Sequence, residues 1–121
     1  MVKNNAGRAL SATLALVLSV AFVSPAFAAG EGAKAFTDLK CNKCHSVTSA
    51  GIKPIKEKKT IRDLSSVGKT YKADWLTKWL KKEVKRDSDV KKGTQVAHKA
   101  KFKGDAKQLT DLVAWMVTLK K

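Results

Sequence analysis

The chain has 121 residues, with 25 Lys and Arg against 10 Asp and Glu and a formal net charge of +15. Such a length accommodates one small domain, which buries only a modest share of its surface and often needs a metal, disulfides or a cofactor for stability. The one long apolar run lies near the start of the chain, so a protein with several membrane spans is excluded.

The first segment has the pattern of a signal peptide. Lys3 and Arg8 precede an uncharged run over residues 9–23 that is rich in Leu, Val and Ala. Small residues at Ala26 and Ala28 complete the A-x-A pattern of a signal-peptidase site. An uncleaved membrane anchor is the alternative, but the run is shorter than the roughly 20 residues that cross a bilayer. We therefore predict a signal peptide over residues 1–28 and export.

Cleavage after Ala28 would leave a periplasmic domain of 93 residues, 29–121, with 23 basic and 10 acidic residues and a formal charge of +13. In the cytoplasm this balance would suggest nucleic acid, which an exported protein rarely meets, so no nucleic-acid partner is expected. The expected partners are proteins with acidic docking surfaces, with anionic lipid as a second, peripheral partner. The chain is expected to act as a monomer.

The domain is predicted to be all-α, with three main helices connected by loops and no internal repeat. Apolar residues at helical spacing predict helices over residues 32–40, 72–86 and 106–119. Asp105 and Gln108 form a capping-box pattern at the start of the last helix.

The stretches between these helices are predicted to be loops. Residues 47–61 and 87–104 are rich in lysine and contain glycine, with a short helical turn expected near Val90. Sustained period-two alternation does not occur after residue 28, so no strands of ordinary length are expected.

Both cysteines lie in one motif, Cys41-Asn42-Lys43-Cys44-His45. A thioredoxin-type centre, half a zinc site and a plain disulfide are the alternatives. A thioredoxin-type centre belongs to a β-α-β setting, which this helical chain lacks. A zinc site would need a further cysteine pair or a histidine cluster, which the sequence does not contain. A histidine directly after the second cysteine favours covalent attachment of haem, with two thiols joined to its two vinyl groups and His45 on the iron.

With this motif placed after a short first helix that holds Phe36, the chain resembles the class I c-type cytochromes over most of residues 29–121. Pro54 follows the motif at a familiar distance, and residues 63–68 with 74–76 are similar to the middle region of the family. The resemblance implies a small cytochrome c fold around one covalently bound haem c, and electron transfer rather than enzymatic catalysis.

The resemblance also implies roles for single residues. The backbone carbonyl of Pro54 would accept a hydrogen bond from His45 Nδ1. Phe36, Leu112 and Trp115 would form the contact between the first and last helices. Trp75, Trp79 or Tyr71 could reach a haem propionate, with ordinary packing against the ring as the alternative; Trp75 is the cofactor-binding candidate among them.

The second axial ligand departs from the family pattern. The usual methionine is absent from the loop before the last helix, and Met116 lies on the apolar face of that helix. His98 occupies the expected place in the loop, so the predicted iron ligands are His45 and His98. Met116, a lysine such as Lys99, and water or an open position are the alternatives.

The predicted function is that of a periplasmic electron carrier with two histidine ligands. A haem enzyme or gas-binding sensor with an open or weak sixth position is the main alternative, and a structural subunit of a larger respiratory complex is a third. The donor, the acceptor and the reduction potential do not follow from the sequence.

Overall fold

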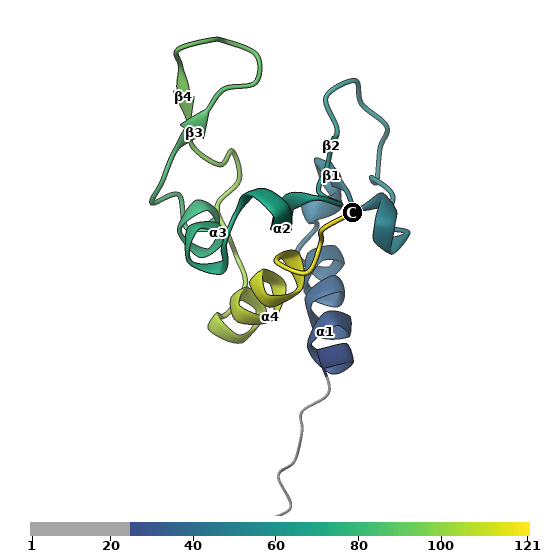
Figure 1. The fold of residues 1–121 in the computed structure, drawn as a ribbon. Helices are drawn as coiled ribbons and strands as arrows, with labels where there is room; N and C mark the ends of the chain where they lie inside the picture. Colours follow the sequence, from purple (N-terminus) through teal and green to yellow (C-terminus); the bar gives the residue numbers. More distant parts are fainter. Residues whose placement is uncertain (1–24) are drawn as a thin grey trace, which may run out of the picture.

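The computed structural model describes residues 25–121, which are built on a first and a last helix that cross each other (Figure 1). Helix α1 spans Pro25–Asp38 and α4 spans Ala106–Met116. The predicted cleavage after Ala28 stays a prediction, because most of the predicted signal peptide lies outside the described residues. The capping box of α4 is confirmed: Asp105 Oδ1 accepts from the Gln108 N–H at 2.8 Å, and Gln108 Oε1 from the Asp105 N–H at 3.0 Å.

Between the crossing helices the chain forms short elements. They are the 3-10 helices η1 (Cys41–Lys43) and η2 (Thr48–Ala50) and the α-helices α2 (Val67–Thr70) and α3 (Ala73–Leu80). The all-α fold class is confirmed, with α1, α3 and α4 as the three main helices. Among the described helices, none is both long and apolar enough to cross a bilayer.

A hydrophobic core fills the space where α1, α3 and α4 meet. The rings of Phe36 and Trp115 meet edge to face, with centroids 5.6 Å apart and planes at 66°. Leu112 is buried in the same cluster, which confirms the predicted contact between the first and last helices. The other buried members are Ala35, Val47, Leu76, Leu80, Val113, Met116 and Leu119.

Gly32 lets the two helices approach closely. A Cβ atom at this position would lie 2.1 Å from Trp115 Cβ and 2.5 Å from the carbonyl oxygen of Asp111. No side chain fits there without moving a helix. The crossing of α1 and α4 therefore depends on the missing side chain of Gly32.

Two pairs of two-residue strands complete the fold. Strand β1 (His45–Ser46) pairs in parallel with β2 (Arg62–Asp63), and β3 (Arg86–Asp87) pairs antiparallel with β4 (Gln95–Val96). The helical turn expected near Val90 is wrong, because these residues join β3 to β4. Figure 1 shows the β1–β2 region and the β3–β4 hairpin on opposite sides of the molecule, with α2 between them and α3 below the hairpin.

The bounds of all three predicted helices differ from the structure. The first helix begins before residue 32 and ends at Asp38, and the last ends at Met116 rather than 119. The second helix ends at Leu80 and not at 86.

The end of α3 is a backbone turn that the sequence does not announce. Lys82 has a left-handed φ of 63°. Its N–H donates to the Trp79 carbonyl at 3.0 Å, and the N–H of Glu83 donates to the Lys78 carbonyl at 2.8 Å. This pair of bonds is a Schellman motif, which usually carries glycine at the left-handed position. A lysine there gives no stop signal in the sequence, which is why the apolar pattern predicts a helix that continues to residue 86.

Candidate cofactor site

The two cysteines lie on one tight turn directly after α1. Lys40 has a left-handed φ of 60°, which ends α1 and directs the chain into η1. Cys41 is half-buried and Cys44 exposed, and both thiols are free. Burial raises the pKa of the Cys41 thiol to about 11. Thioredoxin-type centres need a cysteine with a lowered pKa, so the raised pKa of Cys41 does not favour a role for this thiol as the thiolate in disulfide exchange.

His45 is held by the parallel pairing of β1 and β2. The register places His45 opposite Arg62, and His45 Nδ1 lies 3.3 Å from the Arg62 carbonyl oxygen. The acceptor of this hydrogen bond is therefore Arg62 and not Pro54, which corrects the expectation drawn from the family. Any residue supplies a backbone carbonyl, so the sequence carried no sign of this partner. Pro54 itself is half-buried in the loop between η2 and β2, and its contact with a cofactor stays a prediction.

Asp63 fixes β2 next to this hydrogen bond. Its Oδ1 atom accepts from the Ser65 N–H at 2.9 Å and the Thr48 N–H at 3.3 Å, and the Thr48 hydroxyl donates to Oδ2. The Ser65 hydroxyl adds a further bond at 2.6 Å. The carboxylate thus ties η2 to β2, where the Arg62 carbonyl meets His45.

His98 approaches from the opposite side, just after β4. The ring is half-buried, and Nδ1 lies 2.6 Å from the carbonyl oxygen of Ala100. Its nearest aromatic neighbour on α3 is Trp79, with ring centroids 5.5 Å apart and planes tilted by 60°. A local hydrogen bond and one aromatic contact therefore orient the imidazole.

The structure brings the two histidines together although they are far apart in the sequence. Their ring centroids are 6.2 Å apart and their planes differ by 10°. Burial lowers the pKa of both imidazoles, against the opposing effect of the carbonyls that face Nδ1. Both rings are therefore favoured in the neutral form, which is the form that binds a metal.

An aromatic stack of Tyr71, directly after α2, with Trp75 and Trp79 on α3 reaches His98. Trp75 lies in its middle, with Tyr71 at 4.0 Å and Trp79 at 5.2 Å between ring centroids and all three planes nearly parallel. All three side chains are half-buried. This stack presents a flat apolar wall beside the histidine pair, and direct contact of Trp75 with a cofactor stays a prediction.

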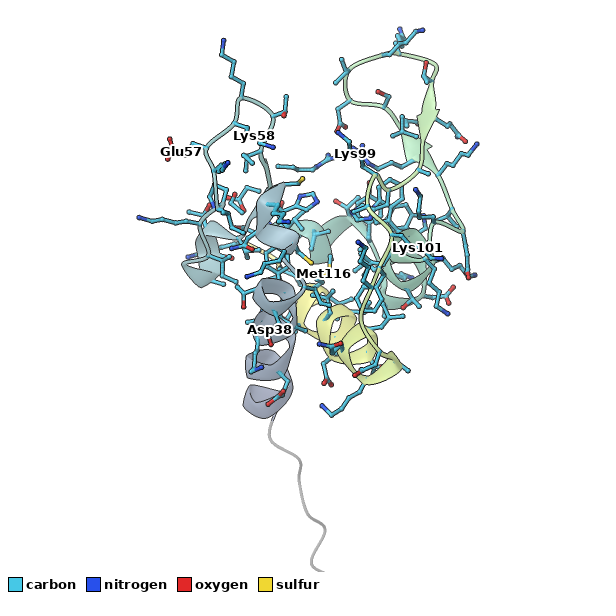
Figure 2. The ribbon with its side chains drawn as sticks, turned by 180° about the vertical axis from the view of Figure 1, so that it is seen from behind. Asp38, Glu57, Lys58, Lys99, Lys101 and Met116 are labelled. Atoms are coloured by element: carbon cyan, nitrogen blue, oxygen red, sulfur yellow. The ribbon has the colours of Figure 1, made fainter. Side chains whose placement is uncertain are left out.

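The other two side chains considered for the iron, Met116 and Lys99, differ in burial. Met116 is buried in the hydrophobic core at the end of α4, as its helical spacing predicted. Lys99 is exposed, next to His98 in the chain. Figure 2 shows Met116 near the meeting point of α1 and α4, and Lys99 on the chain segment on the opposite side from Lys58.

These residues fit a covalently bound haem. Haem brings its own iron, so the protein would need to supply only the thiols that attach it and the side chains that bind the metal. The free thiols of Cys41 and Cys44 precede His45 in the chain, and the imidazole of His98 lies near that of His45. Within residues 25–121, no three His, Cys, Asp or Glu side chains gather as a metal-binding group. Cys41, Cys44 and His45 would hold the haem, which supplies one-electron redox chemistry.

Comparison with known proteins agrees with the site. The family model described as Cytochrome c matches residues 29–120, most of the chain. Neither a curated protein nor a solved structure gives a significant match. With two cysteines and a histidine in its attachment motif and a small helical fold around them, the chain belongs to the cytochrome c family, whose members bind haem c covalently and transfer electrons.

Proposed function

We propose that the protein is a periplasmic, monohaem electron carrier whose iron is bound by His45 and His98. The observation that supports this most strongly is the near-parallel pair of imidazoles with centroids 6.2 Å apart. The two residues come from β1 and from the loop after β4, so no local sequence preference brings them together.

The separation suits one metal ion between the rings. Two metal–imidazole bonds of about 2 Å each take up about 4 Å of it, and the remainder matches the distance from each ring centre to its nitrogen. Nδ1 of each ring faces a backbone carbonyl, of Arg62 and Ala100 respectively. If Nδ1 donates to that carbonyl, the lone pair on Nε2 is free to bind the iron, and the hydrogen bond raises the basicity of the imidazole.

Two imidazole ligands have a chemical consequence. A thioether favours ferrous iron and raises the reduction potential, whereas two imidazoles favour ferric iron. We therefore expect a potential below that of methionine-ligated relatives with similar burial of the haem. Because both axial positions are filled, substrate cannot reach the iron without displacing a ligand, and outer-sphere electron transfer is favoured over catalysis.

The partner is proposed to be a redox protein with an acidic docking surface. Exposed lysines occur in the chain segments next to both histidines: Lys53, Lys56, Lys58 and Lys59 lie before β2, which pairs with the strand of His45, and Lys99, Lys101 and Lys103 follow His98. Such a surface attracts an acidic one at long range, and salt screens the attraction. Complex formation should therefore weaken steeply as ionic strength rises.

The replacement His98→Ala tests the iron ligation in protein made with its haem attached. The oxidised wild type is expected to be low-spin by electron paramagnetic resonance, and His98→Ala should become largely high-spin because the iron loses a strong ligand. Met116→Leu is the matched control and should keep the wild-type spectrum. An unchanged spectrum in His98→Ala would show that His98 is not a ligand of the iron.

Carbon monoxide separates the carrier from a gas sensor. In the reduced wild type it must displace His98, so binding is expected to be slow, whereas the reduced His98→Ala protein should bind it rapidly. Rapid, complete binding by the wild type would favour an open sixth position, as in a haem enzyme or sensor.

Export is tested by mass. Cells that attach haem outside the cytoplasmic membrane should yield a periplasmic protein that begins at Ala29 and carries one haem. A membrane-bound protein that retains residues 1–28 would contradict the proposed location and favour the uncleaved anchor.

A further inference from the structure

One carboxylate joins the two sides of the cofactor site. Asp89, in the turn between β3 and β4, accepts two hydrogen bonds from Arg86, at 2.9 and 2.8 Å. It also accepts from the guanidinium of Arg62 on β2, at 2.7 and 3.4 Å. Both guanidinium groups therefore bind the same carboxylate in a forked arrangement, which is the stronger geometry for such pairs.

The Arg62 arm leads to His45. The guanidinium of Arg62 binds Asp89, while the backbone carbonyl of the same residue faces His45 Nδ1. Any displacement of Arg62 thus moves the acceptor that orients the fifth ligand. Asp63 restrains the backbone next to Arg62, so the connection from Asp89 to His45 is held more firmly than the connection to His98 described next.

The Arg86 arm leads to His98. The guanidinium carbon of Arg86 lies 5.7 Å from the centre of the Trp79 ring, within cation–π distance. Trp79 in turn packs against His98. The side chain of Arg86 is 20% exposed, compared with 56% for Asp89, so the arm runs from solvent towards the site.

Together the contacts form a closed circuit of six residues. It runs through His45, Arg62, Asp89, Arg86, Trp79 and His98, and it closes at the histidine pair. Asp89 is the only acidic member, and without it two guanidinium groups would face each other. A polar groove of about 410 Å³ borders the circuit on the outside, so salt and water reach the carboxylate.

We propose that Asp89 is a positioning residue for the sixth ligand. It binds the β3–β4 turn to β2, and through Arg86 and Trp79 it restrains His98 from leaving the iron. This inference rests on the proposed ligation by two histidines. Because Asp89 is exposed, its contribution should be modest, about a two- to fivefold change in the rate at which His98 dissociates.

The test compares Asp89→Asn with Asp87→Asn, which removes the same charge two residues away. Within residues 25–121, the carboxylate of Asp87 accepts from Gln95 alone, at 3.5 Å, and neither arginine side chain binds it. Carbon monoxide binding to the reduced protein at low ionic strength reports the dissociation of His98. Asp89→Asn should bind about two- to fivefold faster than wild type, while Asp87→Asn should stay near the wild-type rate.

Two further readouts separate positioning from a loss of stability or charge. Asp89→Glu keeps the carboxylate and should recover most of the wild-type rate. High salt should speed the wild type towards the Asp89→Asn rate and leave that variant almost unchanged. Equal rates in wild type and Asp89→Asn, or equal acceleration in Asp87→Asn, would overturn the inference. If His98→Ala kept the wild-type spectrum and carbon monoxide rate, the proposed ligation itself would fail instead.

Discussion

At the scale of single residues, Asp63 shows how an exposed carboxylate can fix the backbone of a site. Burial is the largest single effect and would raise its pKa, but the hydrogen bonds from Ser65 and Thr48 together outweigh it and lower the pKa to about 2. The bonds tie η2 and the chain after β2 to the strand that faces His45. The ionised form of Asp63 is therefore part of the folded structure.

Acid should weaken the fold through this residue. A carboxyl whose pKa is lower in the folded state stabilises the protein above its unfolded pKa, and this contribution disappears as the pH falls towards the folded value. We expect the free energy of unfolding of the wild type to fall by about 1 kcal/mol more than that of Asp63→Asn between about pH 5 and pH 2, after solvent screening is allowed for.

Denaturant titrations at several pH values would measure this difference. Thr48→Val removes one hydroxyl donor and should show an acid sensitivity between those of the wild type and Asp63→Asn. Parallel curves for the wild type and Asp63→Asn over the whole range would show that Asp63 is not stabilised by its hydrogen bonds.

At the scale of elements, the crossing of α1 and α4 depends on one close contact. Gly32→Ala would place a methyl group 2.1 Å from Trp115 Cβ, so the helices must separate. We expect a loss of about 1–3 kcal/mol of unfolding free energy, the usual cost of overpacking a well-packed core.

Gly30 provides the matched control for this substitution in the same helix. Nothing lies within 4 Å of a Cβ atom at Gly30, and alanine favours helix more than glycine does. Gly30→Ala should therefore be neutral or slightly stabilising in thermal unfolding. Equal melting temperatures for the two variants would mean that the helices do not cross as closely as the structure shows.

The elements also show which features a sequence can predict. The capping box at Asp105 and the helical spacing of Phe36, Leu112 and Trp115 are local patterns, and the structure confirms them. The sequence does not predict the end of α3. Lys82 occupies the left-handed position after this helix, where a glycine would usually mark the helix end. The β3–β4 hairpin was missed because strands of two residues are too short to show an alternating pattern.

At the scale of the whole molecule, the site combines a local motif with long-range contacts. The attachment motif at residues 41–45 can be read directly from the sequence, and the family match supports it. The proximity of His98 to His45 was inferred from a resemblance and is seen in the structure as parallel rings. The Arg62 carbonyl and the bridge through Asp89 could not be predicted, because both depend on how distant loops meet.

The positive charge of the molecule should affect the rate at which it reacts with small charged redox reagents. Lys58 and Lys99 lie on two separate chain segments on opposite sides of the view in Figure 2, and both are exposed. Lys58→Glu combined with Lys99→Glu should slow oxidation by hexacyanoferrate(III) by about two- to fivefold at low ionic strength, because an anionic oxidant loses an attractive field.

Two comparisons control this prediction. Lys107→Glu, on α4, should change the rate much less, although it also removes an ion pair with Asp111. A cationic oxidant, hexaammineruthenium(III), should react faster with the double variant than with the wild type. If both oxidants reacted with the double variant at wild-type rates, the lysines beside the histidines would have no part in docking.

The most direct test of the central claim is the near-infrared magnetic circular dichroism spectrum of the oxidised protein, purified with its haem attached. The position of the charge-transfer band reports which atoms bind the iron along the axis. Ligation by His45 and His98 predicts the band of two imidazole nitrogens. A band typical of histidine with methionine sulfur, or of histidine with a lysine amine, would contradict it.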